Sequence, residues 1–304
     1  MKVLRTADEV FEGLPDYSFA PHYAEVADAD GGTLRMHYLD EGPADGEIVV
    51  LMHGEPSWCF LYRTMIPVLV ERGFRCIAPD LVGFGRSDKP TERDDYSYAR
   101  HVEWIRSLLV DHVGISDATF FGQDWGGLVG LRVVAENPDR FARVVVGNTG
   151  LPTGDARITE AFLAWQRFSQ ETPNFDIGVI VSMAVKTPMT EAVVAAYNAP
   201  FPDDTYKAGA RSFPLLVPTS PEDPASPANR AAWEVFTKWD KPLLTLFSDG
   251  DPITAGGERI FQEKVPGAAG QPHRTITDAG HFLQEDKGPE LATAVADLIA
   301  ATRL

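Results

Sequence analysis

The sequence predicts an α/β fold with a mostly parallel central sheet, helices on both faces of the sheet, and an inserted helical lid. Short apolar runs that suit strands buried on both faces alternate with helical stretches, which is typical of parallel sheets. These runs are 48–52, 76–78, 118–121, 144–146, 243–247 and, more weakly, 275–277. Residues 150–217 interrupt this alternation and hold no comparable run. A chain of 304 residues is long enough for one large domain with such an insertion.

The chain begins with a predicted hairpin and ends with a predicted helix. Segments 23–27 and 34–39 flank the sequence Asp28-Ala29-Asp30-Gly31-Gly32, whose glycines favour a tight turn between antiparallel strands. The last helix is predicted from about residue 289 to the end of the chain.

Another helix is predicted directly after the run 118–121. Leu128, Leu131 and Val134 recur there at three-residue steps, which indicates one apolar helix face. Pro138 ends this pattern, because proline cannot continue a helix.

The lid is predicted at 150–217, and the main domain at 1–149 and 218–304. The inserted segment is rich in aromatic residues and prolines, and the proline-rich piece 214–227 leads back to the sheet. Its pattern favours several short helices, at about 161–169, 177–184 and 191–196.

The chain is strongly acidic. Its 27 basic and 44 acidic residues give a formal charge of −17. Such a surface repels nucleic acid and anionic membranes, and it does not gather anionic substrates. It is compatible with a small neutral substrate. We therefore expect no nucleic-acid partner.

No targeting or membrane signal is expected in this sequence. No apolar run approaches the ~18 residues of a membrane span, and residues 1–6 lack the apolar core of a signal peptide. Cys59 and Cys76 lie in or beside apolar stretches, which favours buried thiols in a reducing compartment over a disulfide or a metal site. We expect a cytoplasmic monomer with no membrane partner.

The strongest local motif surrounds one aspartate. Asp124 has glycines two positions before and two positions after it, between a predicted strand and a predicted helix, in the sequence Gly122-Gln123-Asp124-Trp125-Gly126-Gly127. Small flanking residues allow a tight turn that lifts the central side chain above the sheet edge. This pattern usually presents a nucleophilic serine, and here it presents a carboxylate. The motif alone fits equally well a helix start with Asp124 as its N-cap.

A second motif, His53-Gly54-Glu55-Pro56, follows the first core strand. In folds built around such a nucleophile turn, this loop supplies one backbone N–H of an oxyanion hole, and the residue after the nucleophile supplies the other. Glu55 and Trp125 are the predicted donors, through their backbone. A His-Gly turn after a strand is by itself compatible with a purely structural role.

The predicted base is His281, in the loop Asp278-Ala279-Gly280-His281-Phe282 near the end of the chain. The order nucleophile, acid, histidine places the base there and the acid after the preceding strand. Asp251 is the predicted acid. A shift of two residues would instead select Asp249. The histidines at positions 22, 37, 101, 112 and 273 lack this context and are expected to be structural.

The glycine loop after the second core strand is predicted to be structural. The stretch 80–88 contains Gly83 and Gly85 in a G-x-G arrangement, but it lacks the third glycine of a dinucleotide fingerprint and no helix opens on it.

Taken together, these motifs resemble haloalkane dehalogenases of the α/β-hydrolase superfamily, in the subfamily whose catalytic acid follows the strand before the histidine loop. The similarity extends over nearly the whole chain, and its most specific part pairs Gln123-Asp124-Trp125-Gly126-Gly127 with His53-Gly54-Glu55-Pro56. The resemblance implies hydrolysis of carbon–halogen bonds in small neutral haloalkanes to an alcohol, a halide and a proton, without cofactor or metal.

The resemblance also implies how the leaving halide is held. In that family two tryptophan indole N–H groups bind it, one from the residue after the nucleophile and one from the lid. Trp125 and Trp165 match these positions. An indole N–H donates but does not accept, and its ring is apolar, so it suits an anion in a dry site. By the same resemblance, the substrate pocket is lined by Phe162, Phe213, Pro214 and Leu128.

An aspartate suits this chemistry. Saturated carbon has no carbonyl group to polarise, so displacement of a halide needs a nucleophile that is already ionised. A carboxylate, with a reference pKa of about 3.9, meets that need without a base. The predicted intermediate is an alkyl ester of Asp124, which His281 hydrolyses by activating water.

Two other enzyme activities and a non-catalytic role are the alternatives to this prediction. An epoxide hydrolase on the same fold also uses an aspartate and a histidine, together with lid tyrosines, and Tyr197 and Tyr206 are available by composition. Fluoroacetate-type dehalogenases carry an arginine where Trp125 stands. A non-catalytic binding protein on this fold would be expected to lack the nucleophile, the base or the acid, whereas all three are present.

Overall fold

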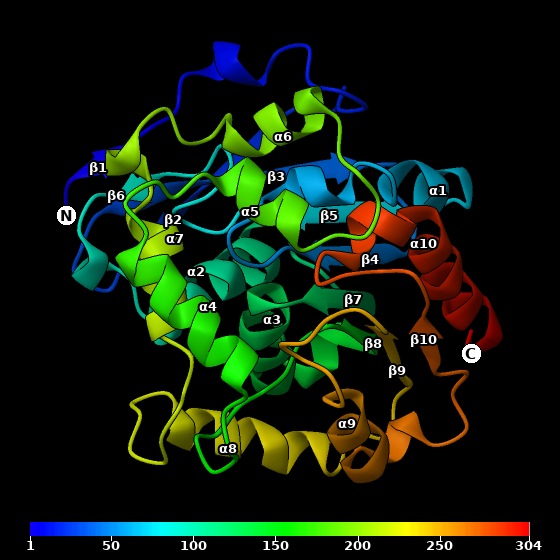
Figure 1. Ribbon diagram of the computed structural model, residues 1–304. Helices are drawn as coiled ribbons and strands as arrows, with labels where there is room; N and C mark the ends of the chain where they lie inside the picture. Colours follow the sequence, from blue (N-terminus) through cyan, green and yellow to red (C-terminus); the bar gives the residue numbers. More distant parts are fainter. Residues whose placement is uncertain (304) are drawn as a thin grey trace.

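The computed structural model describes residues 1–303, which form one eight-stranded sheet, a small two-stranded sheet and the surrounding helices (Figure 1). The strand order of the large sheet is β10-β9-β8-β7-β4-β5-β3-β2. Its strands are β2 (His22–Ala27), β3 (Thr33–Glu41), β4 (Ile48–Met52), β5 (Arg75–Pro79), β7 (Ala118–Gln123), β8 (Phe141–Gly147), β9 (Leu243–Ser248) and β10 (Arg274–Ile276). The small sheet pairs β1 (Val3–Leu4) with β6 (Lys89–Pro90).

The sheet is mostly parallel, as predicted. β2, β3 and β5 pair antiparallel, and every other neighbouring pair is parallel. Each apolar run identified in the sequence is a strand, because the parallel strands are covered on both faces. β7, for example, is buried at all six positions. The predicted hairpin is β2 and β3, joined by residues 28–32.

Helices cover both faces of the sheet. The step from β4 to β5 runs in one direction along the sheet, and the step from β5 to β7 runs back past β4. Because crossovers between parallel strands are right-handed, α1 (Ile66–Glu71) and α2 (Tyr98–Arg106) lie on opposite faces. Later crossovers place α3 (Trp125–Glu136), α8 (Ser226–Phe236) and α9 (Glu258–Lys264) on the α2 face. The last helix, α10 (Leu283–Ala301), packs against α1 (Figure 1).

A group of helices connects β8 to α8. They are α4 (Glu160–Glu171), α5 (Ile177–Met183), α6 (Glu191–Asn198) and α7 (Ala208–Ser212). α4, α5 and α6 coincide with the helices expected in the inserted segment. Each begins at a side-chain N-cap that accepts a backbone N–H, which explains why short helices form here; the caps are Thr159, Asp176 and Thr190.

Short helical turns complete the chain. They are 3-10 turns at Asp8–Phe11, Cys59–Tyr62, Arg93–Asp95, Pro138–Arg140, Asp204–Tyr206, Phe213–Leu215 and Pro266–Ala268, and a π-helical segment at Ser107–His112.

The predicted start of the last helix is wrong. α10 begins at Leu283, six residues before the expected position, and bends at Lys287, whose φ of −139° is not helical. The regular helix resumes after Lys287, with Pro289 near its start, where the missing N–H of a proline is tolerated. The sequence pattern reveals only this second part. α8 was not predicted either, and it begins within the stretch expected to be a connection.

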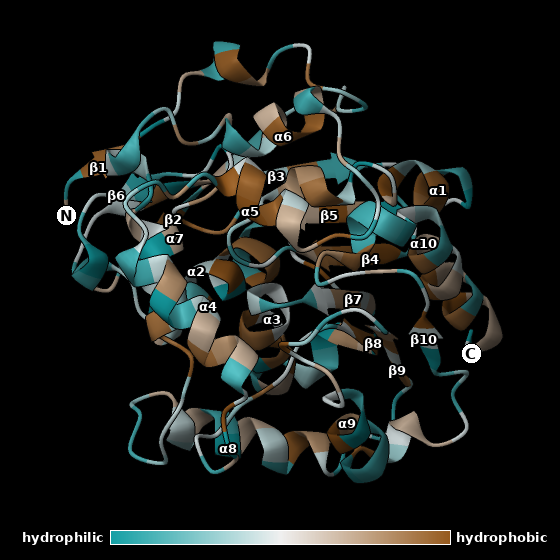
Figure 2. Cartoon of the chain, in the orientation of Figure 1, coloured by the Kyte–Doolittle hydropathy of each residue, from teal (hydrophilic) through white to brown (hydrophobic). Residues whose placement is uncertain are grey.

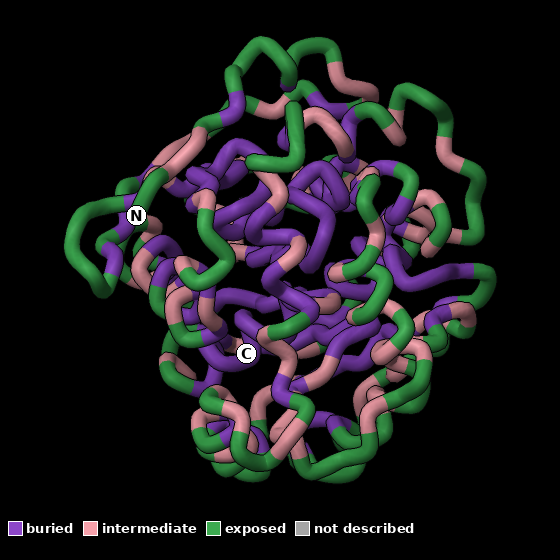
Figure 3. Tube along the Cα trace, turned by 60° about the vertical axis from the view of Figure 1, so that its left-hand side comes forward, coloured by how far each residue is buried: buried purple, intermediate pink, exposed green. Residues whose placement is uncertain are grey.

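The core lies between the sheet and its helices. Apolar segments gather on the strands and on the inner helix faces (Figure 2), and buried residues fill the centre of the molecule (Figure 3). Cys59 and Cys76 are both buried and free. Within residues 1–303, no helix combines the length and hydropathy that a membrane span would require.

Candidate active site

Asp124 lies at the turn between β7 and α3, with φ of 50° and ψ of −131°. This conformation is strained for a residue with a side chain, and surrounding contacts must maintain it. Its backbone N–H donates to Asn148 O at 3.0 Å. Gly126 leaves the room that the turn needs, since a Cβ there would lie 2.0 Å from Met52 O. The turn therefore holds the carboxylate above the sheet edge at the start of α3.

The carboxylate of Asp124 is held from the His53-Gly54-Glu55-Pro56 loop. The backbone N–H of Glu55 donates to Asp124 Oδ1 at 2.8 Å. Gly54 permits this approach, because a Cβ on it would come within 2.3 Å of the same oxygen. Trp125 is the first residue of α3, where backbone N–H groups have no partner within the helix. Both predicted oxyanion donors thus belong to segments that adjoin the nucleophile.

The side chain of Glu55 is a second carboxyl group at this site. It is buried, and its Oε1 has no hydrogen-bond partner in the described chain. Burial, with a further contribution from the negative charge of Asp124, raises the pKa of Glu55 well above its usual value. Burial therefore favours the neutral, protonated form of Glu55 next to Asp124.

His281 lies between two carboxylates. Its Nδ1 is 2.9 Å from Asp251 Oδ2, and its Nε2 is 3.4 Å from Asp124 Oδ2. Burial alone lowers the pKa of the imidazole, but Asp251 and Asp124 outweigh this effect and raise it to about 10. With both carboxylates ionised, His281 is therefore an imidazolium at neutral pH.

Of the two aspartates considered for the acid, Asp251 is the one beside the imidazole. Its carboxylate also accepts the Ile253 N–H at 2.9 Å and the Thr254 hydroxyl. Burial raises the pKa of Asp251, whereas His281 and these hydrogen bonds lower it to about 2. Asp249 instead faces the backbone N–H groups of residues 278 and 279, at 3.3 and 3.5 Å.

Two buried amides that the sequence did not single out for a role hold His281. Asn148 Nδ2 donates to His281 O at 3.0 Å. Gln123 Nε2 lies 3.1 Å from His281 O and 3.1 Å from His281 Nε2. Gln123 is part of the nucleophile motif, yet its partner is 158 residues away, so nothing local in the sequence indicated this contact.

Asp286 links the loop of His281 to the helical insertion. Its carboxylate accepts the N–H of Gly280 at 2.8 Å. It also accepts the N–H of Lys186 at 3.0 Å and that of Thr187 at 2.6 Å. These two residues belong to the segment between α5 and α6. One carboxylate therefore fixes the segment and the histidine loop to each other.

A cavity of about 370 Å³ opens above Asp124. This volume lies within the range of about 300–1,000 Å³ that is typical of small-molecule sites. Asp124 and His281 lie in its wall. The rest of the lining is mostly apolar and comes from the loops after β8 and β9 and from α4, α5 and α8; it includes Leu151, Ile158, Ile180, Val217, Trp233 and Ile253.

Trp125 and Trp165 both line this cavity. Trp58 and Trp233 donate their indole N–H groups to backbone carbonyls, and the indole nitrogens of Trp104 and Trp239 are sealed in the core. The indole nitrogens of Trp125 and Trp165 belong to neither group. They donate to no acceptor within residues 1–303, and they are not among the buried polar atoms. They are therefore free donors for a ligand.

The expected lining residues fall into two groups. Leu128, Phe162 and Pro214 line the cavity. Phe213 does not, and this expectation is corrected: its side chain is fully buried behind Trp125, whose ring lies 4.7 Å away in an edge-on arrangement. Phe213 also packs against His101, so its ring faces the core. It supports Trp125 without reaching the cavity.

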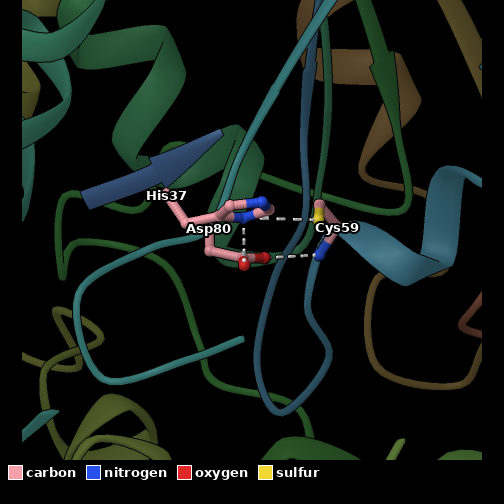
Figure 4. A group of neighbouring side chains, drawn as sticks. All are labelled: His37, Cys59 and Asp80. Carbon is pink, nitrogen blue, oxygen red and sulfur yellow. Dashed lines mark hydrogen bonds and ion pairs between the residues drawn. The ribbon is translucent and has the colours of Figure 1, made fainter. Parts of the chain in front are cut away.

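A buried cluster of His37, Cys59 and Asp80 lies outside the cavity (Figure 4). The ligand-type atoms of these residues lie within 4.8 Å of one another, so a metal site must be considered. However, Asp80 already accepts hydrogen bonds from His37 Nδ1 at 2.7 Å, from Cys59 N at 2.8 Å and from Arg86 N at 2.8 Å. Burial raises the pKa of the Cys59 thiol well above its usual value, which disfavours a thiolate ligand. The cluster fits a hydrogen-bond network that ties the end of β5 to residue 59.

Comparison with known proteins agrees with this site. The chain matches the alpha/beta hydrolase fold family over residues 47–288. It is 59% identical to a haloalkane dehalogenase of Psychrobacter cryohalolentis and 55% identical to one of Mycolicibacterium paratuberculosis, covering 98% and 97% of both chains respectively. A solved tetrameric haloalkane dehalogenase of Paraglaciecola agarilytica is 33% identical, with a TM-score of 0.90 over 100% of this chain and 99% of that one. This chain therefore belongs to the haloalkane dehalogenase family within the α/β-hydrolase superfamily.

Proposed function

We propose that this protein hydrolyses carbon–halogen bonds in small neutral haloalkanes, giving an alcohol, a halide and a proton. One structural observation supports this proposal in addition to the family membership. A carboxylate at a nucleophile turn faces an apolar cavity that also contains two free indole N–H donors. This combination suits displacement at saturated carbon, because it offers an anionic nucleophile and a site for an anionic leaving group.

The first proposed step is an in-line displacement. Asp124 Oδ1 is engaged by the Glu55 N–H, so Oδ2 has the freer lone pairs. Oδ2 forms a bond to the substrate carbon while the carbon–halogen bond breaks and its electron pair leaves with the halide. The indole N–H groups of Trp125 and Trp165 donate to the departing anion. The product is an alkyl ester of Asp124.

The second proposed step is hydrolysis of this ester. The ester of Asp124 carries no charge, so the imidazolium of His281 first gives its Nε2 proton to solvent water. The neutral ring, oriented by Asp251, then takes a proton from a water molecule that attacks the carboxyl carbon of Asp124. Negative charge develops on Oδ1, where the backbone N–H groups of Glu55 and Trp125 can stabilise it. The alkoxide then leaves with the proton from His281, and the new carboxylic acid of Asp124 returns its proton to the ring, which restores the carboxylate and the imidazolium. Each step uses a group of this chain, so the scheme requires no cofactor or metal.

The segment 150–217 is the proposed cap of this site, on a main domain formed by 1–149 and 218–304. It contributes Phe162, Trp165 and Pro214 to the cavity, which supports a role in enclosing the substrate. Exclusion of water strengthens the interaction between the indole N–H groups and the halide.

Replacing Trp165 with Phe is expected to weaken halide binding by about tenfold to a hundredfold, because a hydrogen bond to a charged group contributes about 1.5–3 kcal/mol. The measurement is the Kd for bromide or chloride, from quenching of tryptophan fluorescence or from calorimetry. Trp233→Phe is the matched control: Trp233 lines the same cavity, but its indole N–H donates to Leu151 O at 2.8 Å. Equal halide affinity in the two variants would contradict the role of Trp165.

The experiment that tests the function is a substrate panel. 1-Bromoalkanes and 1,2-dibromoalkanes are assayed by halide release and by pH drop, beside styrene oxide. Halide release without turnover of the epoxide is expected. The converse would support an epoxide hydrolase. The structure gives that alternative little support, because Tyr197 is fully buried and donates to Glu285 Oε1 at 2.5 Å, and neither Tyr197 nor Tyr206 lines the cavity.

The expected cytoplasmic location and monomeric state stay predictions. The solved relative from Paraglaciecola agarilytica is described as a tetramer, so the mass of this protein in solution, measured by light scattering, is the direct test of the monomer.

A further inference from the structure

Gln123 makes two contacts to one histidine. It is the last residue of β7, adjoins Asp124 and is fully buried. Its amide nitrogen lies 3.1 Å from both the backbone oxygen and the Nε2 of His281. The atom in this position must be the nitrogen, because an amide oxygen there would face the His281 carbonyl oxygen at 3.1 Å. The NH2 group can therefore donate one hydrogen to the carbonyl and the other to the ring.

The Nε2 atom of His281 carries either a proton or a lone pair in the plane of the ring. Nδ1 donates its proton to Asp251, so the state of Nε2 decides whether the ring is charged. Two neighbours compete for Nε2. Asp124 Oδ2, at 3.4 Å, needs an N–H and so favours the imidazolium, whereas the amide N–H of Gln123 needs a lone pair and so favours the neutral ring.

We propose that Gln123 is a positioning residue that selects the neutral form of His281 once Asp124 has been alkylated. This inference rests on the proposed function and adds to it the group that prepares the base for ester hydrolysis. In the resting enzyme Asp124 and Asp251 together hold the imidazolium. Alkylation removes the charge of Asp124, and Gln123 is then the better partner for Nε2.

The protons balance in this sequence. The groups that titrate or carry charge around the ring are Asp124, Asp251 and Glu55, and burial favours the protonated form of Glu55. When Asp124 becomes an ester, the imidazolium gives its Nε2 proton to solvent water, which accounts for the proton released by the overall reaction. Gln123 then bonds to the bare Nε2. A hydrolytic water displaces this neutral hydrogen bond, transfers its proton to Nε2 and attacks the ester.

A purely structural role for Gln123 makes a different prediction. Its bond to the His281 carbonyl orders the loop whatever the protonation state of the ring. Loss of that bond alone would slow ester hydrolysis by the same factor at every pH. Loss of the bond to Nε2 would move the pH dependence of hydrolysis, because the neutral ring would lose its partner.

The test follows single turnovers of 1-bromohexane from pH 5 to pH 10 by rapid quench, with the halide burst and the decay of the Asp124 ester measured separately. Gln123→Leu removes the donor. The rate of halide release is expected to stay within about twofold of the wild-type rate. The apparent pKa for ester decay is expected to rise by about 0.5 to 1 unit, the equivalent of one hydrogen bond. At pH values below this pKa, ester decay then falls by about threefold to tenfold.

Gln123→Glu keeps the side-chain shape and places a carboxyl group in direct contact with the ring. There, unlike Glu55, it pairs with the imidazolium, which lowers its pKa as it does that of Asp251, so the carboxylate favours the charged ring. A larger upward shift is expected, of about 1 to 3 units. The apparent pKa for ester decay is therefore expected to be lowest in the wild type, higher in Gln123→Leu and highest in Gln123→Glu. If Gln123→Leu fails to fold, the isosteric Glu variant still carries the test.

Asn148→Ser is the control, because Asn148 donates to the same carbonyl oxygen of His281. Its loss is expected to slow ester decay without moving the pH profile. The inference is overturned if both Gln123 variants keep the wild-type profile or slow decay equally at every pH. If the wild type releases no halide from the substrate at all, the proposed function fails instead.

Discussion

His281→Phe is expected to stop the reaction at the alkyl ester of Asp124. The nucleophile attacks without a base, so the first step should proceed and release one halide per active site. Hydrolysis of the ester should then fall by at least about 10⁴-fold, because no other group is placed to activate water. The carboxylate of Asp251 lies behind the ring, against Nδ1, and does not replace Nε2.

Two measurements report this result. Halide release is expected to end after a single equivalent, and intact mass spectrometry followed by peptide mapping is expected to find the alkyl group on Asp124. The double variant with Asp124→Asn is the control and should carry no adduct. Continued release of halide by His281→Phe, or a substrate-treated sample without modified Asp124, would contradict the two-step scheme.

Asp124→Asn is expected to abolish halide release, with a loss of at least about 10⁴-fold. The neutral amide is a poor nucleophile towards saturated carbon. Asparagine is the informative choice because it has nearly the same shape and, like aspartate, tolerates the positive φ of 50° found at this turn. The Glu55 N–H can still donate to the amide oxygen, so the fold should be retained.

This variant must be assayed as soon as it is purified, since deamidation would regenerate aspartate. Mass spectrometry of the same sample shows how much Asn is still present. Full activity in a sample that is entirely Asn would rule out a carboxylate nucleophile. Halide binding at Trp125 and Trp165 is expected to persist, which separates loss of chemistry from loss of the site.

The central parallel strands could be predicted because they are covered on both faces, so their apolar runs stand out in the sequence. β4 and β7 are examples, with nearly every position buried. α8 and the start of α10 could not be predicted in the same way. Proline stands near the start of α8 and inside α10, and the bend at Lys287 depends on packing that the local pattern does not report.

The site was predictable where chemistry and chain order leave a local signal. The glycines around Asp124 and beside His281 provide such a signal. The choice between Asp251 and Asp249 could not be made, because both follow β9 and only the path of the loop decides which carboxylate meets the ring. Gln123 could not be given a role, because its partner is brought to it only by the fold.

Phe213 illustrates the opposite error. The resemblance suggested that its aromatic ring lines the pocket, but a large apolar side chain can equally support a pocket residue from behind. The edge-on contact with Trp125 shows the second arrangement. Sequence similarity identifies the residue type at a position more readily than the face it presents.

The carboxylate of Asp286 limits how this enzyme can be re-engineered. Because it joins the backbone of Lys186 and Thr187 to Gly280, the helical insertion is not an independent module that can be grafted between relatives at its two ends. A chimaera that replaces residues 184–187 would also disturb the loop that carries the general base. Exchanges confined to α4 would vary the cavity wall and would leave the hydrogen bonds of Asp286 intact.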